Sequence, residues 1–168
     1  MKQLYHFTGA AYLRPIAKHG LTVGDVPTDL QRWKGRVGVW LTSNATPDGH
    51  GLEGSARDKK RYRLTVELDE QAPLLHAWPE WARKHVTKAT REQLHASAPG
   101  FESWFIYFGH IKPAAIVACM DMATGEPLAE WADCFPPVYD AKPVPFERRQ
   151  RWHKALIKQL QRHLRGRQ

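Results

Sequence analysis

Hydrophobic and polar residues alternate most regularly between Arg61 and Leu68. The apolar side chains in this segment have even numbers and the polar ones odd numbers. A period of two is typical of a strand with one buried face. Apolar and aromatic runs predict further strands at residues 3–8, 36–43, 103–108 and 114–120. The pattern therefore predicts a sheet of several short strands.

Helical patterns lie between these strands and at the end of the sequence. Residues 12–21 predict a short helix with Pro15 in its first turn and Gly20 at its end. Two more helices are expected at residues 79–86 and 90–96, the second with Thr90 as its N-cap. Residues 146–164 predict an amphipathic helix with an apolar stripe of Trp152, Leu156, Ile157, Leu160 and Leu164.

The mixture of strands and helices predicts an α+β fold in one domain. The length of 168 residues fits a single hydrophobic core, and 42% hydrophobic with 25% charged residues excludes a disordered chain. Residues 122–145 contain five prolines and no period, which favours an irregular wrap. We expect residues 1–145 to form the domain and residues 146–168 to form a basic amphipathic helix packed on it.

Several classes of protein are excluded or disfavoured by composition. No apolar run approaches the roughly 20 residues that cross a bilayer, and the first residues lack the apolar core of a signal peptide. Two cysteines alone cannot form a disulfide scaffold or a four-ligand zinc site. Histidines are scattered without metal-ligand spacing, so we expect no metal. These features predict a cytoplasmic protein with reduced thiols and no membrane partner.

Positive charge is concentrated in the last segment of the chain. The net charge is +8, and residues 147–168 hold eight Lys or Arg against one acid. Lys and Arg that neutralise phosphates release counterions, so the segment is a candidate nucleic-acid surface. A solvated helix face explains the same charges, and both interpretations stay open. The candidate residues are Arg148, Arg149, Arg151, Lys154 and Lys158, with Arg57, Lys59, Lys60 and Arg61 from a second basic run.

The first 21 residues contain a spaced motif. Tyr5-His6-Phe7-Thr8 on a predicted strand is followed by Leu13 and Ile16 on a predicted helix, and then by Gly20-Leu21. This motif resembles the opening of ADP-ribosyltransferase-fold proteins, most of all the DNA ADP-ribosyltransferase toxins of toxin–antitoxin systems. The similarity continues through Trp40-Leu41-Thr42-Ser43 and returns between Trp104 and Ile116.

The resemblance implies a split mixed or antiparallel sheet that binds NAD as a substrate. By this likeness His6 contacts the ribose and backbone of NAD, and the main chain at Phe7, next to Thr8, holds the nicotinamide amide. Thr42 or Ser43 would contact the nicotinamide ribose, and Tyr12 or Trp40 would stack on the nicotinamide. The family activity implied is ADP-ribosyl transfer to nucleic acid or a nucleic-acid-associated protein, with a neutralising partner protein as a further expectation.

The sequence departs from the family pattern at the catalytic carboxylate. Family members usually carry Glu where this chain has Trp104, and Glu102 lies two residues earlier. A carboxylate near the ribose stabilises the oxocarbenium-like transition state of glycosidic cleavage. Glu102 is therefore the candidate catalytic acid beside His6, provided that a bulge shifts the strand register.

Three alternatives remain open at this point. His6 is equally explained as a satisfied structural histidine, and Thr42 with Ser43 as the start of a turn. A chain without the family carboxylate is also consistent with a non-catalytic module of the same fold that binds nucleic acid or a nucleotide. An RNA-end 2′-phosphotransferase is the third alternative, with Arg14, Arg32 and Arg36 as candidate phosphate ligands.

Overall fold

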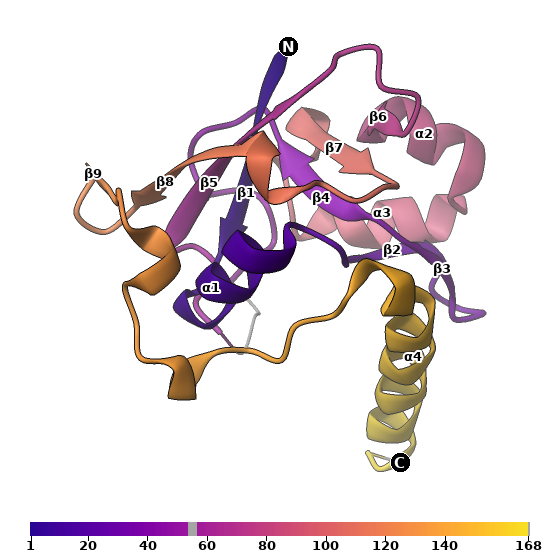
Figure 1. Ribbon diagram of the computed structural model, residues 1–168. Coiled ribbons are helices and arrows are strands. Elements are labelled where there is room, and N and C mark those ends of the chain that lie inside the picture. Colours follow the sequence, from indigo (N-terminus) through magenta and orange to yellow (C-terminus); the bar gives the residue numbers. More distant parts are fainter. Residues whose placement is uncertain (54–56, 168) are drawn as a thin grey trace.

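The computed structural model describes residues 1–53 and 57–167, and its centre is a seven-stranded sheet (Figure 1). The strand order is β6-β7-β4-β1-β5-β8-β9, and neighbouring strands are antiparallel in the described part of the chain. The strands are β1 (Lys2–Thr8), β4 (Val39–Thr42), β5 (Tyr62–Leu68), β6 (Leu75–Ala77), β7 (Trp104–Tyr107), β8 (Ile116–Asp121) and β9 (Glu126–Pro127). The predicted α+β class is confirmed, with a mostly antiparallel sheet and short helices.

A separate hairpin and four α-helices complete the fold. The hairpin consists of β2 (Asp25–Asp29) and β3 (Lys34–Val37), and the sequence patterns did not indicate β2. The helices are α1 (Ala10–His19), α2 (Trp78–His85), α3 (Lys88–Ala96) and α4 (Arg149–Arg165). Short 3-10 turns occur at residues 101–103, 113–115, 131–133, 137–139 and 146–148. No α-helix in the described ranges has the length and apolar character needed to span a bilayer.

The alternation in β5 buries the side chains that the pattern predicted. Tyr62, Leu64, Val66 and Leu68 are all buried, and they pack with Leu13 of α1 in a core on one face of the sheet. A second core lies on the opposite face, where α2 contributes Trp78, Trp81 and Ala82 and β7 contributes Ile106. The sheet is therefore covered on both faces, with α1 on one and α2 on the other.

The predicted single strand at residues 36–43 is wrong, because Gly38 divides it into two strands that belong to different sheets. This residue separates β3 from β4, and its N–H donates to the Gly24 carbonyl at 3.1 Å. A Cβ at Gly38 would lie 3.1 Å from side-chain atoms of Phe108 and Val26. Glycine thus lets the chain pass from the hairpin into the central sheet at a crowded point.

Helix α1 begins two residues before its predicted start, so Pro15 lies inside it and not in its first turn. A proline inside a helix leaves the carbonyl four residues earlier without its helical N–H donor. That carbonyl, on Ala11, accepts a hydrogen bond of 2.7 Å from the N–H of Ala141 in the irregular wrap. A distant segment therefore compensates for the internal proline. The predicted end at Gly20 is confirmed by its left-handed φ of 77°.

Two expectations about the other helices need correction. The N-cap of α3 is Thr87, whose side chain accepts from the N–H of Thr90, whereas Thr90 was predicted to be the cap and is buried inside the helix. Helix α4 contacts the hairpin through its first half, while its later turns extend away from the body of the protein (Figure 1). The contact between the terminal helix and the hairpin is therefore made by its first turns.

Candidate functional site

Strands β1 and β4 lie side by side but separate after a short contact. Strand β1 pairs with β5 along its whole length, whereas it pairs with β4 at Tyr5 and Thr42. Beyond this pair, His6 makes the connection with its side chain: Nδ1 lies 2.9 Å from the backbone oxygen of Trp40. The imidazole of His6 therefore occupies the place where the two strands diverge.

The hydrogen bond to Trp40 determines which nitrogen of His6 carries a proton. A carbonyl oxygen only accepts, so Nδ1 is the donor and Nε2 of the neutral ring is an acceptor. Burial lowers the pKa of His6, the Trp40 bond opposes this, and the positive charge of Lys59 lowers the pKa further. His6 is thus neutral at pH 7. Its Nε2 makes no hydrogen bond to the residues that the structure describes.

Two cations and an aromatic ring accompany His6 on the side of α1. Lys59 is close enough to influence the His6 pKa. The guanidinium of Arg57 lies 5.3 Å from the centre of the Tyr12 ring on α1. Asp58, which lies between these two cations in the sequence, approaches the start of α1, because a Cβ at Gly9 would lie 3.0 Å from the carbonyl oxygen of Asp58. We call His6, Tyr12, Arg57 and Lys59 the His6 cluster.

Of the two residues whose hydroxyls were predicted to share this site, Thr42 has its side chain on the other face of the sheet. Thr42 is directly opposite Tyr5, and neighbouring strand residues point to opposite faces, so His6 and Thr42 are separated by the sheet. Thr42 Oγ1 lies 2.8 Å from Ser103 Oγ, and the Ser43 N–H donates to the Ser103 carbonyl at 2.9 Å. The expectation that the His6 imidazole and the Thr42 hydroxyl meet around one sugar is therefore not met, and Ser43 is bound to the backbone of Ser103.

The rings of Trp40 and Phe7 are engaged in packing. Trp40 packs against Trp78 and Trp104, with ring centres 4.8 and 5.3 Å away, and its Nε1 donates to the Asp25 carbonyl at 2.7 Å. The predicted stacking of Trp40 on nicotinamide is therefore replaced by a core role, although its carbonyl orients His6. Phe7 stacks on His50 at 5.9 Å on the face opposite His6, and the side chain of Thr8 is buried.

Glu102 lies away from His6. It is an exposed residue in the 3-10 turn at residues 101–103, two residues before Trp104, which pairs with Thr42. The register of the strands places Glu102 beyond Thr42, at the end of β4. The backbone of Trp40, to which His6 bonds, lies on the other side of the Tyr5–Thr42 pair. Trp104 itself donates from Nε1 to Nδ1 of His50 at 2.9 Å. The pairing of β4 with β7 is regular from Val39 to Thr42 within the described residues, so the register shift predicted for Glu102 is absent.

Part of the second basic run is used in ion pairs. Lys60 Nζ lies 2.7 Å from Asp48 and 3.2 Å from Glu53. Arg61 makes two bonds of 2.9 Å to Asp121, and this guanidinium lowers the pKa of the Asp121 carboxyl. Lys60 and Arg61 therefore fasten the loop and β5, which leaves Arg57 and Lys59 as the candidates of this run at the surface.

The arginines that a 2′-phosphotransferase would need are also engaged elsewhere. Arg14 donates to Asp140 at 2.9 Å and to the Phe135 carbonyl at 2.6 Å, which holds the irregular wrap. Arg36 lies 4.1 Å from the centre of the Phe108 ring, and Arg32 is paired with Asp29 at 3.8 Å. None of these contacts involves the His6 cluster, so the structure gives this alternative no support.

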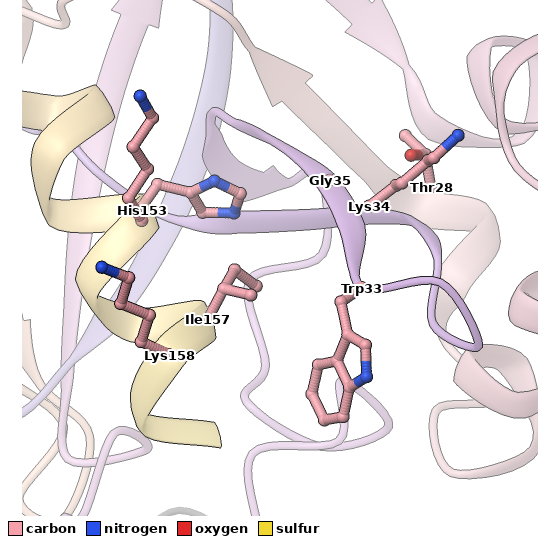
Figure 2. A pocket seen from close by; sticks show the side chains of 8 residues that line it. Thr28, Trp33, Lys34, Gly35, His153, Ile157 and Lys158 are labelled. Carbon is pink, nitrogen blue, oxygen red and sulfur yellow. The ribbon is translucent and has the colours of Figure 1, made fainter. Parts of the chain in front are cut away.

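A groove that the sequence did not indicate lies between the hairpin and α4 (Figure 2). It encloses about 620 Å³. Two of the predicted nucleic-acid-binding residues, Lys154 and Lys158, line this groove. Arg148 and Arg151 are exposed but do not line it. The guanidinium of Arg149 lies 3.8 Å from the centre of the Phe146 ring. We call this the α4 groove; its lining residues are Thr28, Trp33, Lys34, Gly35, His153, Lys154, Ile157 and Lys158. Trp33 in a turn between charged residues was the signal available in the sequence.

Residues 1–53 and 57–167 contain no cluster of three or more His, Cys, Asp or Glu side chains that could hold a metal ion.

Comparisons with known proteins give one distant likeness. No protein-family model and no curated protein matches the sequence. A solved structure named EcPltA is similar over 85% of this chain and 89% of its own, with 10% identity and a TM-score of 0.43. A likeness of this size does not identify a family.

Proposed function

We propose that this chain is an NAD-dependent ADP-ribosyltransferase that modifies nucleic acid or a nucleic-acid-associated protein. The observation that carries the proposal is the neutral His6 imidazole at the separation of β1 and β4, with Nδ1 bound to Trp40 and Nε2 available as an acceptor. The resemblance of the Tyr5–Thr8 segment to the first strand of ADP-ribosyltransferases is the second support for the proposal.

The His6 cluster suits the chemical groups of a dinucleotide. A ribose hydroxyl donates to a neutral imidazole nitrogen, and Lys59 and Arg57 supply positive charge for a pyrophosphate. The Tyr12 ring, already beside Arg57, adds a flat surface. Thr42 and Ser43 do not fit this set in their observed positions, so we assign NAD recognition to the His6 cluster and the main chain of Phe7.

The proposed reaction breaks the bond between ribose C1′ and the nicotinamide nitrogen, and nicotinamide leaves with the electron pair. An oxygen or nitrogen of the acceptor then forms a bond to C1′ and loses its proton. Positive charge develops on the ribose, and a carboxylate stabilises it. Glu102 is our candidate for this carboxylate, which requires the 3-10 turn at residues 101–103 to move toward the His6 cluster.

The position of Glu102 favours a second candidate function, in which NAD or another nucleotide binds without turnover. Glu102 is exposed and Thr42 bonds to Ser103, so the observed structure places neither beside His6. The two functions share the His6 cluster. They differ in whether label moves from NAD to an acceptor.

Binding is tested first, by thermal unfolding with and without NAD. A ligand that binds the folded state alone stabilises it by about 2.7 kcal/mol at a hundredfold excess over Kd. We expect this gain in the wild type and its loss in His6→Ala. His110→Ala is the matched control, because Nε2 of His110 also bonds to a backbone carbonyl, that of His19, at 2.7 Å. An equal gain in His6→Ala and wild type would overturn the proposed site.

Transfer is tested next, with labelled NAD and DNA, RNA or cell lysate. The transferase proposal is supported if the wild type transfers label to an acceptor and Glu102→Gln does not. An NAD-stabilised wild type that transfers no more label than His6→Ala supports binding without turnover.

A further inference from the structure

Trp33 has an unusual backbone conformation at the tip of the β2–β3 hairpin. Its φ is 56°, and it is the one non-glycine residue with a positive φ among the residues described. A bulky residue in this region is strained, and such strain persists where the surrounding structure imposes it. The indole is half-buried and forms one wall of the α4 groove (Figure 2).

Helix α4 supplies the other wall and is fixed by one buried contact. The buried His153 has Nε2 2.7 Å from Asp25 Oδ1 on β2. Ile157, one turn later, points into the groove from the same helix (Figure 2). The groove therefore has an indole on one side and an aliphatic side chain on the other.

The rim of the α4 groove is positively charged. Lys154 and Lys158 are four residues apart on α4, so they lie on one side of the helix, and both are exposed. Lys34 is an exposed cation of the hairpin that also lines the groove. No ion pair involving these three lysines is found within the described ranges, and no carboxylate is among the lining residues.

Arg151 and Arg162 continue the row of Lys154 and Lys158 along α4 at spacings of three and four residues. Both arginines are exposed. The positive row is therefore longer than the groove and follows the axis of the helix.

We propose that the α4 groove binds single-stranded nucleic acid, with a base stacked on Trp33 and backbone phosphates held by Lys154 and Lys158. An aromatic ring beside a row of cations is the arrangement that recognises unpaired bases, because the faces of bases are covered in a duplex. Charge complementarity selects a polyanion. The inference goes beyond the proposed function by adding a second binding site, for a single strand, at the α4 groove.

The stacking half of the proposal is tested without NAD. Fluorescence anisotropy would follow fluorescein-labelled oligothymidylate and oligouridylate of about 15 nucleotides binding to the full chain. Trp33→Gly removes the ring and suits the positive φ, so the hairpin backbone is favoured and not disrupted. We expect binding to weaken at least about fivefold in Trp33→Gly and to be largely kept in Trp33→Phe.

The electrostatic half uses two double variants with the same change in charge. Lys154→Glu with Lys158→Glu alters the groove, and Lys18→Glu with Lys112→Glu alters exposed lysines outside its lining. Each phosphate contact on a single strand contributes about 0.7 to the slope of log K against log salt. We expect the groove variant to lose at least about 1.4 of this slope, and the control variant to lose less.

The proposal would be overturned by unchanged binding in Trp33→Gly, by equal slopes in the two double variants, or by equal binding of a duplex of the same length. Displacement of the oligonucleotide by phosphatidylserine vesicles but not by unlabelled single strand would also overturn it, in favour of a membrane surface. NAD stabilisation should survive in Trp33→Gly. Failure at the groove is therefore distinguishable from failure at the His6 cluster.

Discussion

Strand β1 and helix α4 carry the two proposed binding functions, and the rest of the fold holds them very differently. Strand β1 lies between β4 and β5, and its Leu4 side chain is fully buried in the core under α1. Helix α4 touches the hairpin with its first turns, and Leu160 and Leu164 remain 40% and 50% exposed (Figure 1). One element is enclosed by the core, and the other is attached to its surface.

This difference separates what controls each site. At His6, burial sets the protonation state, and buried groups are screened little by salt. Along α4 the cations are exposed, so salt concentration governs their interaction with phosphates. Substitutions in β1 or its neighbours should therefore affect folding and NAD binding together, whereas substitutions of the exposed cations of α4 should affect nucleic-acid binding alone.

The largest effect is expected from Leu64→Ala. Leu64 is fully buried in β5 and lies opposite His6 in the register of the sheet. Removing its side chain loses apolar burial and leaves a cavity, so the free energy of unfolding should fall by about 2–5 kcal/mol. Urea unfolding followed by tryptophan fluorescence measures this change.

Leu160→Ala is the matched control for Leu64→Ala because it makes the same truncation on the extended part of α4. Its side chain is already 40% exposed, so the loss should be below about 1 kcal/mol. Equal losses in the two variants would show that α4 is as integrated into the core as β5, and the comparison would fail.

An intermediate effect is expected from His153→Ala, which removes the buried contact between α4 and Asp25. Loss of a buried hydrogen bond costs about 1–3 kcal/mol, and here the loss should loosen one element. Hydrogen exchange should therefore accelerate at residues 149–158, while amides of β1 keep their wild-type protection. Asp25→Asn is the control, since its amide oxygen still accepts a hydrogen bond and exchange should change less. Equal acceleration in β1 would contradict local detachment.

The regular elements were predictable because their signals are local. The alternation at Tyr62–Leu68 gave β5 and its buried face, and Gly20 gave the end of α1. The internal Pro15 was misplaced because its compensation comes from Ala141, a contact that no local pattern contains. The hairpin strand β2 was missed because Pro27 and two aspartates hide its strand character.

The composition of the site was less predictable because it depends on register. Local motifs identified His6 and Thr42, but the pairing of Tyr5 with Thr42 decides that the two side chains face opposite ways. A shift of one residue in that pairing reverses the result. The α4 groove depends in the same way on a contact between His153 and Asp25, which are 128 residues apart in the sequence.

The smallest effect concerns pH and again contrasts β1 with α4. Burial lowers the pKa of His6 in the folded state, so on acidification below about 6.5 the unfolded chain binds protons first. Stability is therefore full above this pH and is lost as pH falls through the folded-state pKa. His50, His76 and His95 have pKa values lowered mainly by burial and add to the same loss.

His6→Gln isolates the share of this loss that belongs to β1, because glutamine stays neutral at every pH. Chemical unfolding between pH 7.5 and 5.5 should give a shallower fall in stability for His6→Gln than for the wild type. NAD stabilisation of the wild type should decline once the pH falls through the lowered folded-state pKa of His6, because protonated Nε2 no longer accepts a hydrogen bond. Identical pH slopes for the two proteins would mean that His6 takes up its proton as easily in the folded chain as in the unfolded one. The half-buried neutral acceptor proposed to bind NAD would then not exist, whereas oligonucleotide binding at the α4 groove would be untouched.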